Sequence, residues 1–306
     1  MKQSVTLSVN DEIIAKMRDF YLDYMVPNDG QYVDFMAIYN NIIITAYKSK
    51  KELKKVTFIG DASLNEAKIW DINAKINEVK EKVKAEWLCL ENQIGSDEVG
   101  VGDFLAPMIV VAAFVRKKDL SILKRYGVTD SKKMTDEYIL SIGEELGKKF
   151  FISKLTLPNE KYNEMYAKGE NLNSLKAKMH NRALLNMYKK FPDTKHIFVD
   201  QFVSPETYFA YLNDANEMQV RNITFRTKGE SYYPSVALAS VMARYSFLQE
   251  MKKLEIKYGT TIPLGASTKV NEFAKKFIEK FGLDEFNKIC KKNFANYREV
   301  ISISLL

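Results

Sequence analysis

The order of apolar and polar residues predicts a small sheet domain at the start of the chain. Behind a cap at Asn10 or Asp11, residues 10–26 place apolar side chains at helical spacing. Four segments around this helix alternate between apolar and polar residues as strands do: residues 4–9, 31–40, 41–49 and 54–60. We therefore expect residues 1–61 to form a small sheet with one packed helix.

A second domain is predicted after a charged helical connector, which we assign to residues 62–88. In residues 89–306, the segments with strand character are residues 92–99, 107–115, 150–157, 196–200 and, more weakly, 222–226. The segments with helical character are residues 135–149, 171–190, 234–255, 267–281 and 283–294. Early strands followed by alternating helices and strands predict a mixed sheet covered by helices.

The composition excludes several classes of protein. Of the 306 residues, 46% are hydrophobic, a normal share for a globular protein, and no apolar run reaches membrane-spanning length. The first residues lack the layout of a signal peptide. Two cysteines cannot form a disulfide framework, and two histidines argue against a histidine-based metal site. We expect a cytoplasmic protein with no membrane partner.

The charge of the chain is compatible with a polyanionic partner. The formal net charge is +7 and the isoelectric point is about 9.0. A basic surface in a lysine-rich proteome explains these values equally well. Locally, residues 116–133 carry seven basic residues against two acidic ones, and residues 176–195 carry six against one. Basic surfaces of this kind can follow a phosphate backbone.

Two adjacent acids, Asp97 and Glu98, stand between apolar segments in the stretch "IGSDEVGVGDF". Three interpretations fit acids that are flanked by glycines. A turn requires only the ordinary turn chemistry of aspartate and glycine. A phosphate-binding glycine loop fits poorly, because neither of the two common glycine patterns is present. The third interpretation is a site for divalent cations.

Two acids further along the chain favour the cation site. Asp200 ends an apolar segment, and Glu230 precedes a long helix, where helix capping is the alternative role. Mg²⁺ takes oxygen ligands, and two such ions about 3.5–4 Å apart can activate a water and stabilise the leaving oxygen of a phosphodiester. One objection remains open. Adjacent strand residues point to opposite faces, so Asp97 and Glu98 should not both face one ion unless the flanking glycines bend or end the strand.

Seven segments then occur in a recognisable order: "GSDEVGVGDFLAP", "TDSKKM", "NLNSLKAKMHNRAL", "FVDQF", "TKGESYYPSVALASVMAR", "PLGASTKV" and "FANYRE". Over roughly residues 93–299 they resemble the type 2 ribonucleases H, in the form typical of bacterial ribonuclease HIII. The first domain is similar to the TATA-box-binding-protein-like domain that precedes the catalytic domain in that family. The resemblance implies an α/β fold, in which a small α+β domain precedes a ribonuclease-H-like mixed sheet covered by helices.

The resemblance also implies roles for particular residues. The four active-site acids, which would bind metal, are Asp97, Glu98, Asp200 and Glu230. The expected substrate contacts come from a backbone loop that reads 2′-hydroxyls and from two lysines, that is, from Gly100, Val101, Gly102, Lys132 and Lys133. Val101 stands where many family members have threonine, and Gly229 stands where alanine is usual.

The resemblance thus implies an endonuclease that uses Mg²⁺ or Mn²⁺, with two ions during catalysis. It would cut the RNA strand of RNA–DNA hybrids and leave 5′-phosphate and 3′-hydroxyl ends. The hybrid is the expected partner, bound in part by the N-terminal sheet domain, and no obligate protein partner is indicated. Two alternatives are incision at single embedded ribonucleotides, as in ribonuclease HII, and non-catalytic binding of nucleic acid. The four acids disfavour pure binding, because they would repel phosphate. His180 is expected to pack at the surface.

Overall fold

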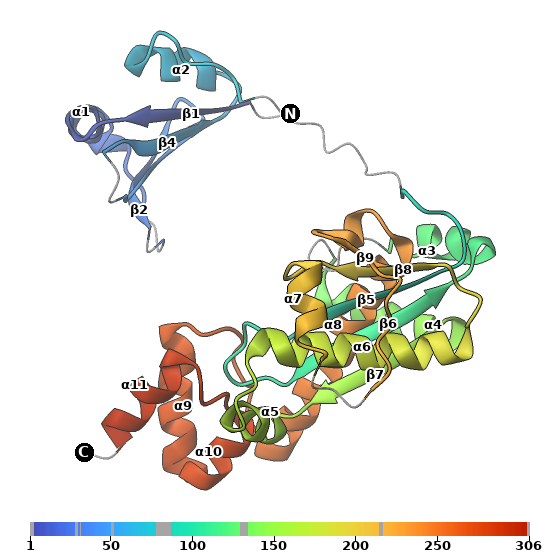
Figure 1. Ribbon diagram of the computed structural model, residues 1–306. Helices are drawn as coiled ribbons and strands as arrows, with labels where there is room; N and C mark the ends of the chain where they lie inside the picture. The colour runs from blue at the N-terminus through green and yellow to red at the C-terminus, as the bar shows by residue number, and fades with distance from the viewer. Residues whose placement is uncertain are drawn as a thin grey trace. The chain divides into compact units, whose positions relative to one another are not determined.

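The chain folds into two compact units, Met1–Val83 and Lys84–Leu306, each with its own sheet and its own core (Figure 1). The structure is a computed structural model that describes residues 3–27, 30, 32–49, 52–77, 87–128, 134–213 and 217–304. Among these residues, no helix is both long enough and apolar enough to cross a membrane.

The N-terminal unit contains a four-stranded antiparallel sheet with the strand order β1-β4-β3-β2. Its strands are β1 Ser4–Val9, β2 Val33–Tyr39, β3 Ile42–Tyr47 and β4 Lys54–Ile59. Asn40 and Asn41 join β2 to β3 with φ angles of 47° and 61°, which is the geometry of a type I′ turn. The predicted hairpin is therefore confirmed.

The first helix is shorter than the sequence pattern predicts. α1, Asp11–Phe20, begins behind Asn10, whose side chain accepts a hydrogen bond from the backbone of Ile13. A 3₁₀ turn, η1 (Leu22–Tyr24), follows it in place of the expected helix up to residue 26. Between the two, Tyr21 is fully buried and its hydroxyl donates to the carboxylate of Glu66, while its own carbonyl accepts the N–H of Tyr24 in the 3₁₀ pattern.

Part of the expected connector belongs to the N-terminal unit. α2, Ser63–Trp70, packs against β1 and β4, and Ala67 lies in the core of this unit. Further along, Asn77 donates its backbone N–H to the carbonyl of Ser4. The burial of Ala67 explains why this segment folds onto the sheet instead of linking two domains. Residues 78–86 of the expected connector lie outside the described residues.

The second unit is built on a five-stranded mixed sheet with the strand order β7-β6-β5-β8-β9. The strands are β5 Gln93–Val99, β6 Met108–Val115, β7 Phe151–Leu157, β8 His196–Asp200 and β9 Thr224–Arg226. β5 runs antiparallel to β6 and parallel to β8. The predicted fold class, a mixed sheet covered by helices behind a small separate domain, is confirmed.

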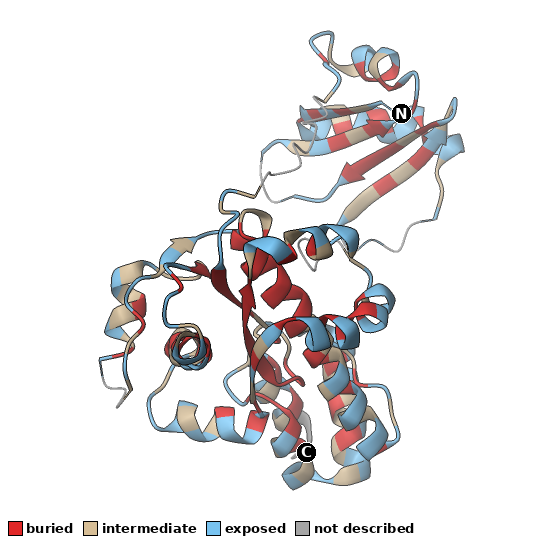
Figure 2. Ribbon diagram, turned by 90° about the vertical axis from the view of Figure 1, so that its right-hand side faces the viewer, coloured by how far each residue is buried: buried red, intermediate tan, exposed pale blue. Residues whose placement is uncertain are grey.

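Helices cover both faces of this sheet (Figure 1). α8, Pro234–Tyr258, and α4, Asp136–Lys149, pack on one face, where Val111 of β6 points. α6, Leu172–Lys190, packs on the other face, where Val110 points. Because both faces are covered, β6 is buried along its whole length (Figure 2).

The structure describes eight further helices in the second unit. They are η2 Lys117–Asp119, α3 Leu120–Arg125, α5 Asn159–Ala167, α7 Pro205–Ala210, η4 Gly229–Ser231, α9 Thr268–Phe281, α10 Leu283–Ile289 and α11 Ala295–Ser304. The sequence pattern did not predict α3, α5, α7 or α11. The helix expected over residues 283–294 ends at Ile289, and the chain turns before it enters α11.

A glycine sets how closely the central strand approaches α8. A Cβ atom on Gly95 would lie 2.4 Å from the hydroxyl of Ser235 and 2.5 Å from the backbone nitrogen of Val236. Only glycine allows β5 to lie this close to the start of the helix. The close packing brings the segment before α8, which carries Glu230, next to the sheet.

Candidate active site

Three of the four predicted acids come from separate segments that meet at one edge of the sheet. Asp97 lies near the end of β5 and Asp200 ends the neighbouring parallel strand β8, one residue beyond the Ser96–Val199 pair. Asp200 also accepts a hydrogen bond of 2.9 Å from the backbone of Gly229. That bond holds the η4 turn, and with it Glu230, at the same edge.

Asp97 is buried on the side of the sheet that α8 covers. Its side chain is 7% exposed, hydrogen-bonds Ser240 of α8 and accepts a 2.7 Å hydrogen bond from the backbone of Glu98. Burial raises the pKa of the Asp97 carboxyl well above its usual value, and the charges of Glu98 and Asp200 raise it further. Several negative charges therefore converge where Asp97 lies.

Glu98 points to the opposite face of the sheet, toward α6. One carboxylate oxygen lies 2.5 Å from the ammonium of Lys176, and the other lies 2.9 Å from Nε2 of His180. Burial by itself would raise the pKa of Glu98, but the hydrogen bonds and charges of His180 and Lys176 outweigh it and lower the pKa to about 2. The objection that adjacent strand residues face opposite ways is thus correct for this pair.

His180 is not a surface residue, so the sequence-based expectation for it was wrong. The imidazole is fully buried, with Nδ1 2.8 Å from the hydroxyl of Ser96, and it stacks on the ring of Phe202. Lys176 lies over the same ring, 3.9 Å from its centre. Lys176 and His180 are four residues apart and share one helix face, a spacing that could have linked them in the sequence.

Glu230 lies one turn before α8 and not at its cap position. α8 begins at Pro234 with Tyr233 as its N-cap, while Glu230 sits in η4 and is 6% exposed. The ring of Tyr233 stacks on Phe198 of β8 at 3.7 Å, so it packs at the helix start. The capping alternative for Glu230 therefore does not describe its position.

In the loop after β5, Gly100 and Gly102 are explained by different physical requirements. Gly100 has φ +85°, and a Cβ atom there would lie 2.1 Å from the carbonyl oxygen of Pro107, so the loop itself requires this glycine. Gly102 is exposed, and a Cβ there would meet no atom of the described residues within 4 Å. Val101 between them is half-buried. The predicted substrate-binding residues Lys132 and Lys133 lie outside the described residues.

The donor set fits a hard divalent cation in its chemistry. It consists of carboxylates, which hard cations prefer, and a bound cation would relieve the repulsion that raises the pKa of Asp97. Among the described residues, no three side chains of His, Cys, Asp or Glu already stand together as ligands. Both oxygens of Glu98, in particular, are held by Lys176 and His180.

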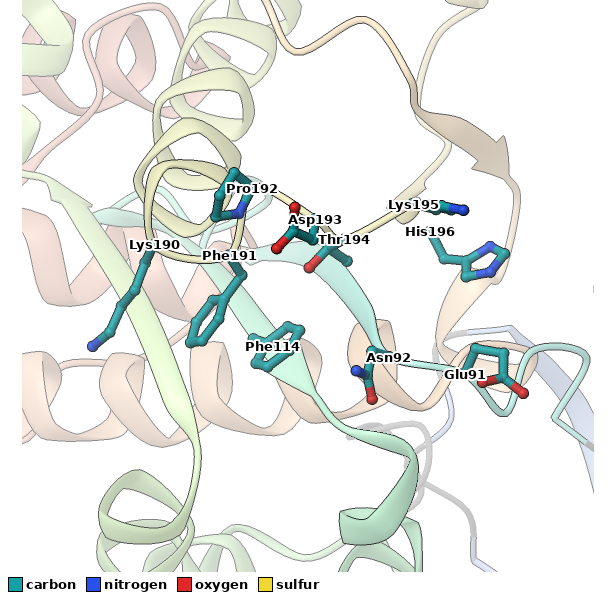
Figure 3. Close-up of a pocket in the computed structure, with 10 residues that line it drawn as sticks. All are labelled: Glu91, Asn92, Phe114, Lys190, Phe191, Pro192, Asp193, Thr194, Lys195 and His196. Carbon is teal, nitrogen blue, oxygen red and sulfur yellow. The ribbon is translucent and has the colours of Figure 1, made fainter.

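A separate surface pocket lies at the other end of the strands (Figure 3). Asn92, just before β5, and His196, the first residue of β8, both line it. The acids stand at the far ends of the same two strands. This pocket is therefore not part of the site that the acids form.

Two comparisons of sequence identify the family of the chain. The family profile described as "Ribonuclease HII" matches residues 94–297. A ribonuclease HIII of Bacillus cereus is 39% identical over 306 residues, which cover 97% of each chain. The chain belongs to the ribonuclease HIII family. Ribonuclease HIII of Bacillus anthracis is 38% identical with the same coverage.

One solved structure agrees with this family assignment, and a second shares the fold. The structure described as Bst-RNase HIII in complex with Mn²⁺ matches with a TM-score of 0.68 and 29% identity, covering 98% of this chain and 99% of the other. RNase HII of Archaeoglobus fulgidus, solved with PCNA, shares the fold over 67% of this chain and 96% of its own, at 23% identity and a TM-score of 0.55.

Membership of the ribonuclease HIII family makes the chain an endoribonuclease, that is, a hydrolase. A second family profile, a domain of unknown function named DUF3378, matches residues 4–84 of the N-terminal unit. The name of this second profile assigns no activity to the N-terminal unit.

Proposed function

We propose that this member of the ribonuclease HIII family uses divalent metal ions to cleave the RNA strand of RNA–DNA hybrids, leaving 5′-phosphate and 3′-hydroxyl ends. The observation that supports it best is the convergence of Asp97, Asp200 and the turn with Glu230 at one edge of the sheet. Carboxylates near a phosphodiester would repel it, so their convergence is useful only if a cation binds between them and the substrate.

Asp97, Asp200 and Glu230 would hold the metal, Mg²⁺ or Mn²⁺, with Glu98 as the fourth acid and two ions during catalysis. When bound, such ions activate a water and stabilise the leaving oxygen of a phosphodiester. The protein's own part is to keep its acids ionised and in place. Lys176 and His180 do this for Glu98, because they favour its charged form.

Selection of RNA is assigned to the loop of Gly100, Val101 and Gly102. RNA differs from DNA by its 2′-hydroxyls, which a hybrid displays in a wide, shallow minor groove. Gly102 is exposed and has no internal reason to be glycine, which fits a backbone that a nucleic acid approaches closely. Lys132 and Lys133 are proposed to contact the substrate backbone.

The N-terminal unit is proposed to bind the substrate as well. It comprises the domain that the sequence predicts over residues 1–61 together with α2 from the connector predicted over residues 62–88, and it precedes the catalytic domain proposed over residues 89–306. One face of its sheet packs on its core, through residues such as Val5, Ile44 and Phe58. The other face carries small hydroxyl side chains in one row, because Thr6 pairs with Thr57 and Thr57 with Thr45. Ile43 and Ile59 pair on the same face, and in the hydroxyl row Thr6 is exposed whereas Thr45 is buried. A cytoplasmic location stays a prediction.

Cleavage of a labelled RNA–DNA hybrid in Mg²⁺, and again in EDTA, tests the proposal. Asp97→Asn and Asp200→Asn should abolish cleavage but leave hybrid binding largely intact, because an amide is a poor ligand for a hard cation but has nearly the same shape. Asp193→Asn is a matched control, since Asp193 is exposed at the opposite end of the sheet. Cleavage in EDTA, or an active Asp97→Asn variant at saturating metal, would show that the site assignment is wrong.

A further inference from the structure

A buried lysine far away in the sequence holds the loop that follows β5. Lys291, between α10 and α11, is fully buried. Its ammonium donates hydrogen bonds to three backbone carbonyls of this loop, those of Gly100 at 2.8 Å, Asp103 at 2.6 Å and Ala106 at 2.5 Å. An ammonium group has three donors, so all of them are satisfied by one loop.

Further hydrogen bonds, from the backbone of Lys291 and from the segment before α9, also hold this loop. The N–H of Lys291 donates to the carbonyl of Phe104 at 3.0 Å. From the segment before α9, Gly265 donates its N–H to the side chain of Asp103 at 2.6 Å and accepts the N–H of Phe104 at 3.0 Å. The conformation of the loop is therefore set by two C-terminal segments and not by its own sequence alone.

A buried ammonium needs a specific explanation, because burial of a charge costs free energy unless hydrogen bonds compensate for it. Burial lowers the pKa of Lys291 to about 7, against the opposing effect of Asp103. A methionine would fill a similar volume without this cost, but it would leave the carbonyls of Asp103 and Ala106 without the donor that Lys291 supplies. The carbonyl of Gly100 would keep only the longer bond of 3.4 Å from the N–H of Asp103. The lysine is thus explained by the loop that it organises.

We propose that Lys291 is a positioning residue that shapes residues 100–106 for the recognition of RNA. The carbonyls of Gly100 and Asp103 are drawn inward to the ammonium, so Val101 and Gly102 between them form the accessible tip of the loop. This inference rests on the proposed function, in which the backbone of that tip reads 2′-hydroxyls. Lys291 itself is buried, so it acts only through the loop.

The test compares the affinity of the full chain for an RNA–DNA hybrid with its affinity for a DNA duplex of the same sequence, both in EDTA. Lys291→Met should weaken hybrid binding about tenfold, the effect of losing one or two hydrogen bonds to 2′-hydroxyls, and should change DNA binding less than about twofold. Lys292→Met is the matched control, because the neighbouring lysine is exposed and carries the same charge. It should leave the preference for the hybrid unchanged.

A second variant and a second measurement separate positioning from a purely structural role. Lys291→Gln keeps two N–H donors, so it should fold and retain an intermediate preference for the hybrid. Hydrogen exchange of both variants should speed up in residues 100–106 and stay close to wild type in β5, β6 and α8. If either variant binds the two duplexes with an equal loss of affinity, or with no loss, Lys291 does not position the loop.

The same experiments distinguish a failure of this inference from a failure of the proposed function. If the wild-type chain shows no preference for the hybrid and no cleavage of it, the proposed function is wrong. Hydrogen exchange then still reports whether Lys291 holds residues 100–106. If the wild-type chain prefers the hybrid and Lys291→Gln keeps the full preference, only the role of Lys291 is wrong.

Discussion

The two adjacent acids Asp97 and Glu98 should affect the stability of the metal-free protein with opposite signs. The surroundings of Glu98 lower its pKa from 4.5 to about 2. A shift of about 2.5 units at 1.36 kcal/mol per unit amounts to about 3 kcal/mol of stabilisation at pH 7. Because the folded pKa is the lower one, this stabilisation is present above about pH 4.5 and is lost as the pH falls toward 2. Glu98→Gln should therefore cost about 3 kcal/mol at pH 7.

The opposite holds for Asp97. Burial and the charges of Glu98 and Asp200 raise its pKa, so keeping it ionised at neutral pH opposes folding. This cost grows as the pH rises above the ordinary pKa of 3.8. Asp97→Asn removes the charge and keeps the shape, so it should raise the free energy of unfolding at pH 7 in the absence of metal.

Scanning calorimetry in EDTA measures both effects, with the transition of the catalytic unit resolved from that of the N-terminal unit. At about 2–4 °C per kcal/mol for a unit of this size, Glu98→Gln should lower the melting temperature by about 6–12 °C. Glu91→Gln is the control, because Glu91 forms an exposed pair with Lys117 and should contribute less than about 1 kcal/mol. A Glu98→Gln variant as stable as wild type, or an Asp97→Asn variant that is less stable, would refute the electrostatic reasoning.

Three further predictions concern the loop, the N-terminal unit and the substrate. Gly100→Ala should lower stability by more than about 2 kcal/mol, because φ is +85° and the added Cβ meets Pro107, whereas Gly102→Ala should stay within about 0.5 kcal/mol in denaturation and weaken hybrid binding. Deletion of residues 1–86 should weaken the affinity for the hybrid far more than it slows turnover at saturating substrate, and it should reduce the salt dependence of binding. An unchanged salt slope would contradict this. In Mg²⁺, a uniform hybrid should be cut efficiently and a DNA duplex with one ribonucleotide weakly or not at all; faster cutting of the latter would favour an HII-like preference.

Local patterns in the sequence were enough to locate most elements of the fold. The strand character of residues 92–99 and of the apolar run 107–115 predicted β5 and β6, and the apolar segment that ends at Asp200 predicted β8. Period-two geometry also predicted correctly that Asp97 and Glu98 face opposite ways. These features depend on neighbouring residues, which is why they can be read without a structure. The same approach missed short helices such as α5, because tertiary packing stabilises them more than their own periodicity does.

Only the tertiary structure showed which distant groups are the hydrogen-bond partners of each buried charged side chain. The sequence determined that acids stand at the ends of two strands, but not that Lys176 and His180 of α6 hold Glu98, nor that Lys291 holds a loop some 190 residues earlier. A lysine in a charged segment is ordinarily solvated, and only the packing of the folded chain shows that Lys291 is buried. The physical reason is that the cost of burying a charge is met by partners that the fold, and not the local sequence, brings within hydrogen-bonding distance.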